Sequence, residues 1–172
     1  MSLHGTLLDV HGVGILLLGP SGIGKSECAL ELVARGQRLV ADDVVYLRSG
    51  DENELFGSAP ERIRHYMEIR GLGILYIPDL FGAEAVREEV RIDLACRLEQ
   101  WQEGVAYERV GMERRTEEIE GVAVPTLTLS ARPAGSMATI VEVAARDLLK
   151  RRAGVVAPRR LDERLRSEMQ RS

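Results

Sequence analysis

The residues from Gly19 to Ser26 read GPSGIGKS and complete the pattern GxxxxGK[ST] of a phosphate-binding loop, or P-loop. The glycines let backbone N–H groups turn toward a polyphosphate, and the N-terminus of a following helix adds partial positive charge. The lysine ammonium can reach the terminal phosphates, and the serine hydroxyl can bind magnesium. The positions assigned to the nucleotide are Gly19, Pro20, Ser21, Gly22, Ile23, Gly24, Lys25 and Ser26. The pattern predicts binding of a nucleoside triphosphate or a similar phosphate.

A P-loop works only between a strand and a helix, and the neighbouring residues predict both. Residues 13–18 (VGILLL) form an apolar run that indicates a short buried strand. Residues 26–35 have a helical pattern that ends at Gly36. The context therefore supports the motif.

An acidic pair, Asp42 and Asp43, follows a predicted strand over residues 37–41. Ligands bind at strand ends in parallel α/β architecture, and adjacent carboxylates near phosphate repel one another. That repulsion raises the pKa of one group and makes it a better general base. The alternative is a turn with solvated aspartates, since aspartate favours turns.

The remaining pattern mixes strands and helices. We expect strands over 6–11 and 74–77, an extended segment over 44–48, a helical segment over 60–67, a half-exposed strand over 90–98, one or two strands over 122–129, and helices over 137–152 and 158–171. The last helix carries a stripe of Leu161, Leu165 and Met169, which could pack on its own core, on a neighbouring subunit or on a small protein.

Composition limits the possible classes of protein. The chain of 172 residues is long enough for one domain, and 45% apolar and 29% charged residues are an ordinary balance. The net charge of −4 gives no general support for a nucleic-acid partner, and no apolar run approaches a membrane span. Cys28 and Cys96 have no metal-binding spacing and are expected to be reduced, buried thiols in a cytoplasmic protein.

From about residue 3 to residue 165 the chain closely resembles the catalytic C-terminal domain of the HPr kinase/phosphorylase family. The resemblance rests on the order and spacing of several motifs. They are HG at 4–5, GPSGIGKSE at 19–27, RLVADD at 38–43, EIRGLGI at 68–74, LFGA at 80–83 with AVR at 85–87, and IVEVAA at 140–145.

The resemblance implies an α/β fold of mixed β-sheets with flanking helices around the P-loop, similar to phosphoenolpyruvate carboxykinase. It implies an ATP- and Mg²⁺-dependent kinase that phosphorylates a serine of the phosphocarrier protein HPr. With inorganic phosphate, the same enzyme would remove the phosphoryl group and release pyrophosphate. Family members are hexamers, so we expect a homo-oligomer. Residues 1–172 are expected to form a single catalytic domain without the family's N-terminal domain.

The resemblance also assigns roles to residues. The catalytic positions are Asp43, His4, Lys25, Arg109 and Asp42, with Asp43 as the group that exchanges the serine proton. The magnesium ligands are Ser26 and Glu68, although Glu68 and Arg70 could instead be a surface pair. The dephosphorylation loop comprises Ser130, Ala131, Arg132, Pro133, Ala134 and Gly135. Its usual Gly-Arg-Asn run is replaced by Ala-Gly-Ser at 134–136.

Two alternative functions remain open from the sequence. One is a kinase of the same fold that acts on another serine or on a small molecule. The other is a P-loop module that binds nucleotide as a switch and has no need of Asp43.

Overall fold

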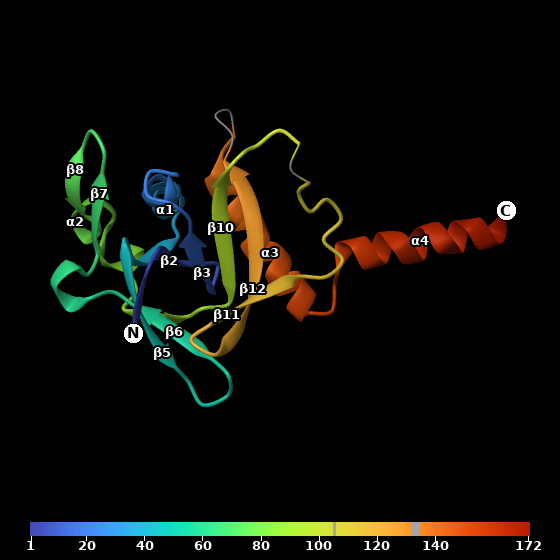
Figure 1. Cartoon of the computed structure of the whole chain (residues 1–172), viewed down its shortest axis with the longest axis horizontal. Coiled ribbons are helices and arrows are strands. Elements are labelled where there is room, and N and C mark those ends of the chain that lie inside the picture. Colours follow the sequence, from blue (N-terminus) through green and yellow to red (C-terminus); the bar gives the residue numbers. More distant parts are fainter. Residues whose placement is uncertain (105, 132–134) are drawn as a thin grey trace.

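The computed structural model describes residues 1–104, 106–131 and 135–172, and its centre is a six-stranded mixed sheet (Figure 1). The strands lie in the order β11-β12-β10-β3-β2-β4. They are β2 (Thr6–Val10), β3 (Val13–Leu18), β4 (Arg38–Ala41), β10 (Leu94–Gln100), β11 (Arg115–Ile119) and β12 (Val122–Ala131). β3 pairs parallel to β10 and antiparallel to β2, so the strand before the P-loop lies inside the sheet.

Both faces of this sheet are covered, which explains the unbroken apolar run of β3. Ile15 and Leu17 belong to a core cluster with residues of α1 (Lys25–Ala34) and α3 (Met137–Arg152). Leu16 and Leu18 belong to a second cluster on the opposite face, shared with a smaller sheet. Successive side chains of a strand point to opposite faces, so a strand between two cores is apolar throughout.

The smaller sheet is antiparallel and has the order β1-β5-β6-β9. Its strands are β1 (Ser2–His4), β5 (Val44–Ser49), β6 (Leu55–Ser58) and β9 (Glu89–Arg91). The chain passes from β4 in the large sheet to β5 in the small sheet through Asp42 and Asp43. The acidic pair therefore lies where the chain changes sheets.

The predicted helix over 60–67 is wrong. Its first half is a single 3-10 turn, η1 (Glu61–Ile63), and its second half begins a hairpin of β7 (Tyr66–Ile69) and β8 (Gly73–Tyr76). The physical reason is the alternation within β7, which buries Met67 and Ile69 in the core and leaves Tyr66 and Glu68 exposed. The hairpin continues into α2 (Ile77–Phe81) and η2 (Ala83–Ala85).

The predicted half-exposed strand over 90–98 is also wrong. The segment divides into β9 and β10, which belong to different sheets, and β10 is buried on both faces except near its end. The chain crosses between the sheets at Asp93, whose carboxylate accepts the Gly14 N–H at 2.9 Å and bonds from Arg91 and Arg152. Apolar and polar residues keep alternating across this crossing, so the sequence pattern does not reveal that one strand ends there and another begins.

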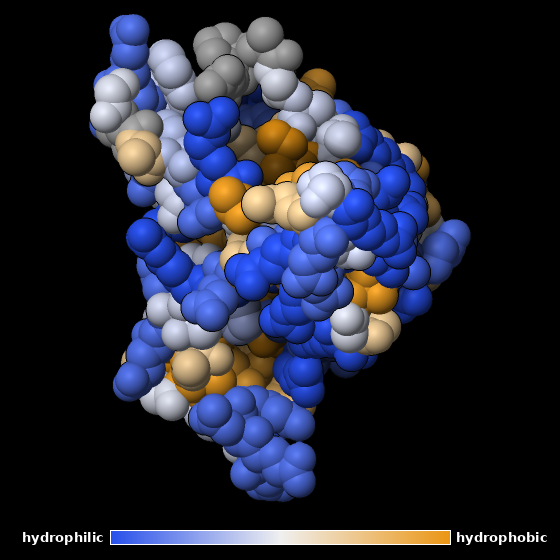
Figure 2. Space-filling model, turned by 90° about the vertical axis from the view of Figure 1, so that its right-hand side faces the viewer, coloured by the Kyte–Doolittle hydropathy of each residue, from blue (hydrophilic) through white to orange (hydrophobic). Residues whose placement is uncertain are grey.

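The helices near the C-terminus follow the prediction. α3 has the expected bounds, and α4 (Ala157–Arg171) begins one residue earlier than expected and projects away from the body (Figure 1). Its stripe of Leu161, Leu165 and Met169 is exposed, so the alternative of packing on its own core is wrong here. Seen from the side of α4, the surface is mostly hydrophilic with separate hydrophobic patches (Figure 2).

Residues 122–129 lie in one strand that continues through Pro125, and its partner β11 was not predicted. Cys28 and Cys96 are unpaired and buried as predicted, and burial raises the pKa of each thiol to about 12. Within the described ranges, no helix combines the length and the apolarity needed to cross a membrane. The α/β fold with mixed sheets and flanking helices around a P-loop is confirmed.

Candidate functional site

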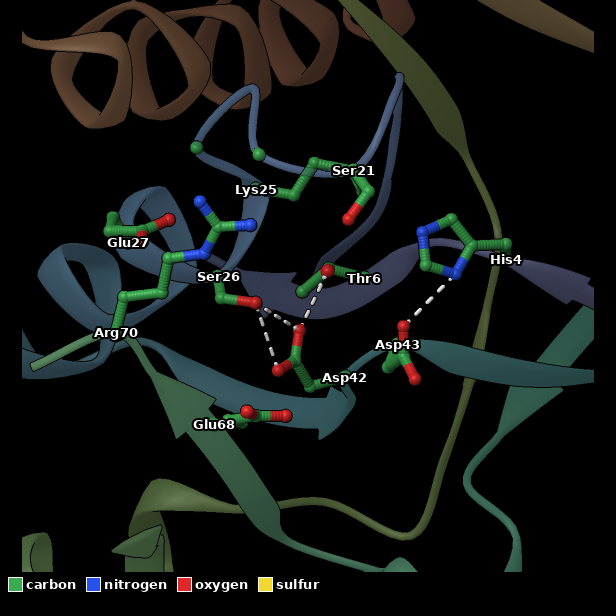
Figure 3. A pocket seen from close by; sticks show the side chains of 12 residues that line it. His4, Thr6, Ser21, Lys25, Ser26, Glu27, Asp42, Asp43, Glu68 and Arg70 are labelled. Atoms are coloured by element: carbon green, nitrogen blue, oxygen red, sulfur yellow. Dashed lines mark hydrogen bonds and ion pairs between the residues drawn. The ribbon is translucent and has the colours of Figure 1, made fainter. Parts of the chain in front are cut away.

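A cavity of about 330 Å³ opens where the P-loop, the acidic turn, the end of β1 and the hairpin meet (Figure 3). Four separate segments of the chain contribute to its wall. Of the residues assigned from sequence to catalysis or metal binding, those that line it are His4, Lys25, Ser26, Asp42, Asp43 and Glu68, and of the other P-loop positions Ser21, Gly22 and Gly24 line it too. The fold thus brings together six of the seven residues assigned to catalysis or metal binding.

The P-loop takes its shape from glycines with positive φ. Gly24 has φ of 111° and directly precedes α1, while a Cβ on Gly19 would lie 2.6 Å from the Leu98 carbonyl oxygen. Other residues would be strained or would clash at these points. The Lys25 ammonium is buried and donates to the carbonyls of Gly19 at 2.6 Å and Pro20 at 3.0 Å. Burial lowers the pKa of Lys25, and the negative charges of the acidic turn oppose that shift.

Asp42 lies next to the P-loop and is hydrogen-bonded to its last residue, Ser26. Its Oδ1 accepts bonds from Thr6 Oγ1 at 2.8 Å and from Ser26 Oγ at 2.9 Å, and Oδ2 lies 3.0 Å from Ser26 Oγ. Burial raises the pKa of Asp42, the hydrogen bonds from Thr6 and Ser26 lower it, and the charge of Asp43 adds to the rise. The expected mutual repulsion is present, but burial is the larger cause and the affected group is Asp42.

Asp43 has a different environment although it is the next residue. Its φ of 71° and the bond from Val44 N–H to the Asp42 carbonyl at 2.9 Å define a tight three-residue turn. Such a conformation is strained for a residue with a side chain. His4 Nδ1 lies 3.0 Å from Asp43 Oδ1, and both side chains are exposed. The turn therefore holds one carboxylate under the P-loop and presents the next to solvent.

The hairpin supplies the opposite wall. Glu68 and Arg70 come from β7 and the residue after it, and both point into the cavity (Figure 3). The Arg70 guanidinium reaches over the P-loop, with Nη2 3.8 Å from the position of a Cβ on Gly22. Glu68 and Arg70 both line the cavity beside the P-loop. They are therefore not a surface pair away from the site, which was the alternative left open by the sequence.

Sequence reasoning missed three polar residues of the cavity, Thr6, Glu27 and Arg70. Arg70 belongs to the EIRGLG motif, so the motif could have identified it as a site residue. Glu27 is in the first turn of the P-loop helix, and Thr6 is a strand residue without any motif of its own. Only the pairing of β2 with β3 and β4 reveals that Thr6 lies beside Asp42.

The oxygen atoms at the base of the cavity suit magnesium. Ser26 donates its proton to Asp42, which leaves the lone pairs of its hydroxyl oxygen to accept a cation. Asp42 and Glu68 add carboxylates to the same cavity. Across the described residues, no group of three or more His, Cys, Asp or Glu is placed to hold a metal. A small set of protein oxygens completed by phosphate and water is the usual magnesium arrangement.

The structure does not bring Arg109 to this cavity. Arg109 is exposed in the segment between β10 and β11. Nearby carbonyls of that segment, at Gly111 and Met112, accept bonds from Arg151 of α3 at 2.6 Å and 3.4 Å. These bonds hold the segment against α3, so the catalytic role that the resemblance assigns to Arg109 stays a prediction.

The predicted dephosphorylation loop is only partly described. Ser130, Ala131 and Gly135 line a separate cavity, of about 460 Å³, together with Ile23 and Gly24 of the P-loop. Arg132, Pro133 and Ala134 lie outside the described residues. The loop's assignment to dephosphorylation stays a prediction.

The chain is similar to known proteins over most of its length. A family model described as the HPr Serine kinase C-terminal domain matches residues 1–165. An HPr kinase/phosphorylase of Caldicellulosiruptor bescii is 52% identical over 168 residues, which is 98% of this chain and 54% of the relative. That of Bacillus subtilis is 48% identical over 164 residues, 95% of this chain and 53% of the relative.

A solved structure gives the same result for the fold. It is described as the Hpr(Ser) kinase/phosphatase from Coxiella burnetii and superposes with a TM-score of 0.82 at 32% identity, covering 90% of this chain and 93% of the other. The chain spans about half the length of the two sequence relatives described above, at 54% and 53%.

Proposed function

The chain belongs to the HPr serine kinase C-terminal domain family, and we propose that it is an ATP- and Mg²⁺-dependent kinase that phosphorylates a serine of HPr. One observation carries the proposal. A phosphate-binding loop and a solvent-facing carboxylate, that of Asp43 at the strained turn, line the same cavity. Phosphoryl transfer to a protein hydroxyl needs this combination, because the acceptor must approach from solvent.

On the phosphate side, the residues would act mainly by position and charge. Backbone N–H groups of the P-loop and the N-terminus of α1 would bind the phosphates of ATP, with Lys25 near the transferred group. Ser26, Asp42 and Glu68 would hold magnesium, which supplies charge neutralisation for the phosphates when it is bound. Arg70, which reaches over the P-loop, adds a second cation on the hairpin side.

On the acceptor side, Asp43 would take the serine proton. His4 holds one of its oxygens at 3.0 Å, so the other oxygen is available to accept the proton while the serine oxygen attacks phosphorus. Asp43 would return the proton to the serine oxygen in the reverse reaction, in which inorganic phosphate takes the phosphoryl group and pyrophosphate leaves. We propose this phosphorolysis because the sequence relatives are named kinase/phosphorylase.

Further properties are part of the proposal. We propose that residues 1–172 form one catalytic domain, because both core clusters lie on the faces of one six-stranded sheet. We also propose a homo-hexamer, and the exposed stripe of α4 offers an apolar surface for a neighbouring subunit. The proposed cytoplasmic location and the expectation that nucleic acid and membrane are not partners stay predictions.

The proposal is tested by intact-mass spectrometry of purified HPr after incubation with this protein and magnesium ATP. We expect HPr to gain one phosphoryl group, and a serine-to-alanine HPr to gain none. ATP binding is measured in parallel by titration. If ATP binds and HPr gains no mass, HPr is not the acceptor, and the alternative of a kinase for another hydroxyl replaces the proposal. A nucleotide-binding switch is the less favoured alternative, because it gives no role to the exposed Asp43 beside His4.

A further inference from the structure

A second cavity, of about 360 Å³, adjoins the cavity of about 330 Å³ beside the P-loop and has a different chemical character. The two cavities share Asp42, Asp43 and Glu68. The rest of the lining comes from η1 and the hairpin and is largely apolar: Arg62, Ile63, Tyr66, Met67 and Ile74. The acidic turn thus separates a polar cavity beside the P-loop from an apolar one beside the hairpin.

The hairpin register explains why apolar side chains face this cavity. Tyr66 pairs with Tyr76, and Glu68 pairs with Ile74, so these four side chains share one face of the hairpin. The other face is used by the core, which contains Met67 and Ile69. The magnesium-ligand candidate and an isoleucine are therefore direct cross-strand neighbours, and the rings of Tyr66 and Tyr76, 4.8 Å apart, support each other.

The apolar side chains of this wall are unusually exposed. Ile74 is 75% exposed, Tyr66 45% and Ile63 42%. The core does not need them, because Met67 and Ile69 already anchor the hairpin. Exposed apolar side chains that cluster beside a functional group, instead of being scattered, mark a surface that a partner covers.

The position of Asp43 limits what that partner is. Asp43 lies at the edge common to both cavities, so a serine that reaches it brings its neighbouring residues over the apolar cavity. The nucleotide phosphates belong on the other side, with Lys25 and the P-loop. We propose that the second cavity binds an apolar side chain adjacent to the acceptor serine of the protein substrate, and that Ile74 and Ile63 are its main contacts.

This inference rests on the proposed kinase function and adds a determinant of acceptor choice. An apolar contact made equally in the bound and transition states contributes to affinity and leaves the chemical step unchanged. The contact therefore affects KM for the protein acceptor, whereas His4, Asp43 and the magnesium ligands affect kcat. Arg62, at the margin of the cavity, adds a positive charge to the same docking surface.

The test uses Ile74→Ser and Ile63→Ser with HPr as acceptor and magnesium ATP. We expect each variant to raise KM for HPr by about 10- to 100-fold, which is the size expected for losing one buried aliphatic contact. ATP affinity and kcat are expected to change by less than about twofold, because neither side chain lines the cavity beside the P-loop. Both side chains are exposed, so the melting temperatures should be close to that of the original protein.

The matched control is Val143→Ser, which removes an equally apolar side chain that is 56% exposed on α3. Its KM for HPr should be unchanged. A second arm replaces with alanine, one at a time, the apolar residues that flank the acceptor serine of HPr. One of these alanine substitutions should raise KM as much as Ile74→Ser does. When it is combined with Ile74→Ser, KM should be no higher than with either change alone, because both changes remove the same contact.

The outcomes separate the two proposals. If the original protein does not phosphorylate HPr, the proposed function fails, and the docking inference fails with it. If the original protein is active and the KM for HPr is unchanged in both isoleucine variants, the docking inference alone is overturned. An equal rise in KM for Val143→Ser, or additive effects throughout the second arm, would also overturn it.

Discussion

The P-loop and the β7–β8 hairpin, which form two walls of the cavity beside the P-loop, are built differently. The P-loop wall lies between β3, which is paired on both sides in the six-stranded sheet, and α1, which packs on that sheet. The hairpin wall is a separate two-stranded sheet, and among the described residues its strands pair only with each other. Two-stranded hairpins are only marginally stable on their own, so the stability of this one depends on the side chains that it inserts into the core.

The walls also differ in what they offer to a ligand. The P-loop takes its backbone course from glycines with positive φ and from the start of a helix, and its N–H groups would bind phosphate. The hairpin presents side chains, among them Glu68 and Arg70. The proposed phosphate contacts therefore depend mainly on the main chain, whereas the proposed metal and acceptor contacts could change by side-chain substitution without altering the P-loop. Four predictions follow from this contrast.

The largest expected effect is on the turn between the walls. Asp43→Asn should lower phosphoryl transfer in both directions by about 10²- to 10⁴-fold, the usual contribution of a general base. Asparagine tolerates positive φ as aspartate does, so the turn should be retained. ATP affinity, measured by titration, should stay within about twofold. Normal turnover by this variant would remove Asp43 from the mechanism.

A second prediction tests whether the hairpin depends on its core contacts. Met67→Ala should cost about 2–5 kcal/mol, because the side chain is almost completely buried. Amide hydrogen exchange should accelerate more over 66–76 than over β3. The control is Met169→Ala on the exposed face of α4, which should change stability by less than about 0.5 kcal/mol. Equal acceleration in the hairpin and in β3 would mean that the two walls open together.

A third prediction separates metal binding from phosphate binding. Glu68→Gln keeps the shape of the side chain and removes its charge, so the magnesium concentration for half-maximal rate should rise by about 10- to 100-fold. Nucleotide affinity without magnesium should be unchanged, since the P-loop is intact. Glu61→Gln, an exposed carboxylate of η1, is the control. An unchanged magnesium requirement would exclude Glu68 as a ligand.

The smallest expected effect concerns Asp42 and depends on pH. Burial raises its pKa, so the folded state binds this proton more tightly than the unfolded state. The contribution to stability is then complete below the unfolded pKa of about 3.9 and is lost as pH rises through the folded value. Asp42→Asn should therefore raise the melting temperature at pH 8 by about 2–4 °C, with the difference shrinking toward pH 4. A lower melting temperature at pH 8 would show that the bonds from Thr6 and Ser26 outweigh the cost of burial.

The same two walls show how much of the site could be predicted from the sequence. The P-loop wall was predicted correctly in its strand, loop and helix, because each depends on neighbours in the chain: apolar periodicity, glycines and a helix start. In the hairpin wall, the predicted helix over 60–67 ran into the start of β7, since Met67 and Ile69 become a buried strand face only against a core made by other segments, whereas the strand predicted over 74–77 corresponds to β8. The family resemblance found Glu68 despite that error, because a motif does not require a correct secondary structure.

The sequence by itself determined the phosphate-binding loop, the acidic turn, the α/β class with mixed sheets, and both C-terminal helices. Only the tertiary structure decided that Asp42 is buried under Ser26 while Asp43 faces solvent, that Thr6 supports Asp42, and that Arg109 lies outside the cavity. It also decided that Ile74 stands beside Glu68 at an apolar cavity. The physical reason is that local patterns fix backbone geometry, whereas burial and charge environment arise from pairing between distant segments.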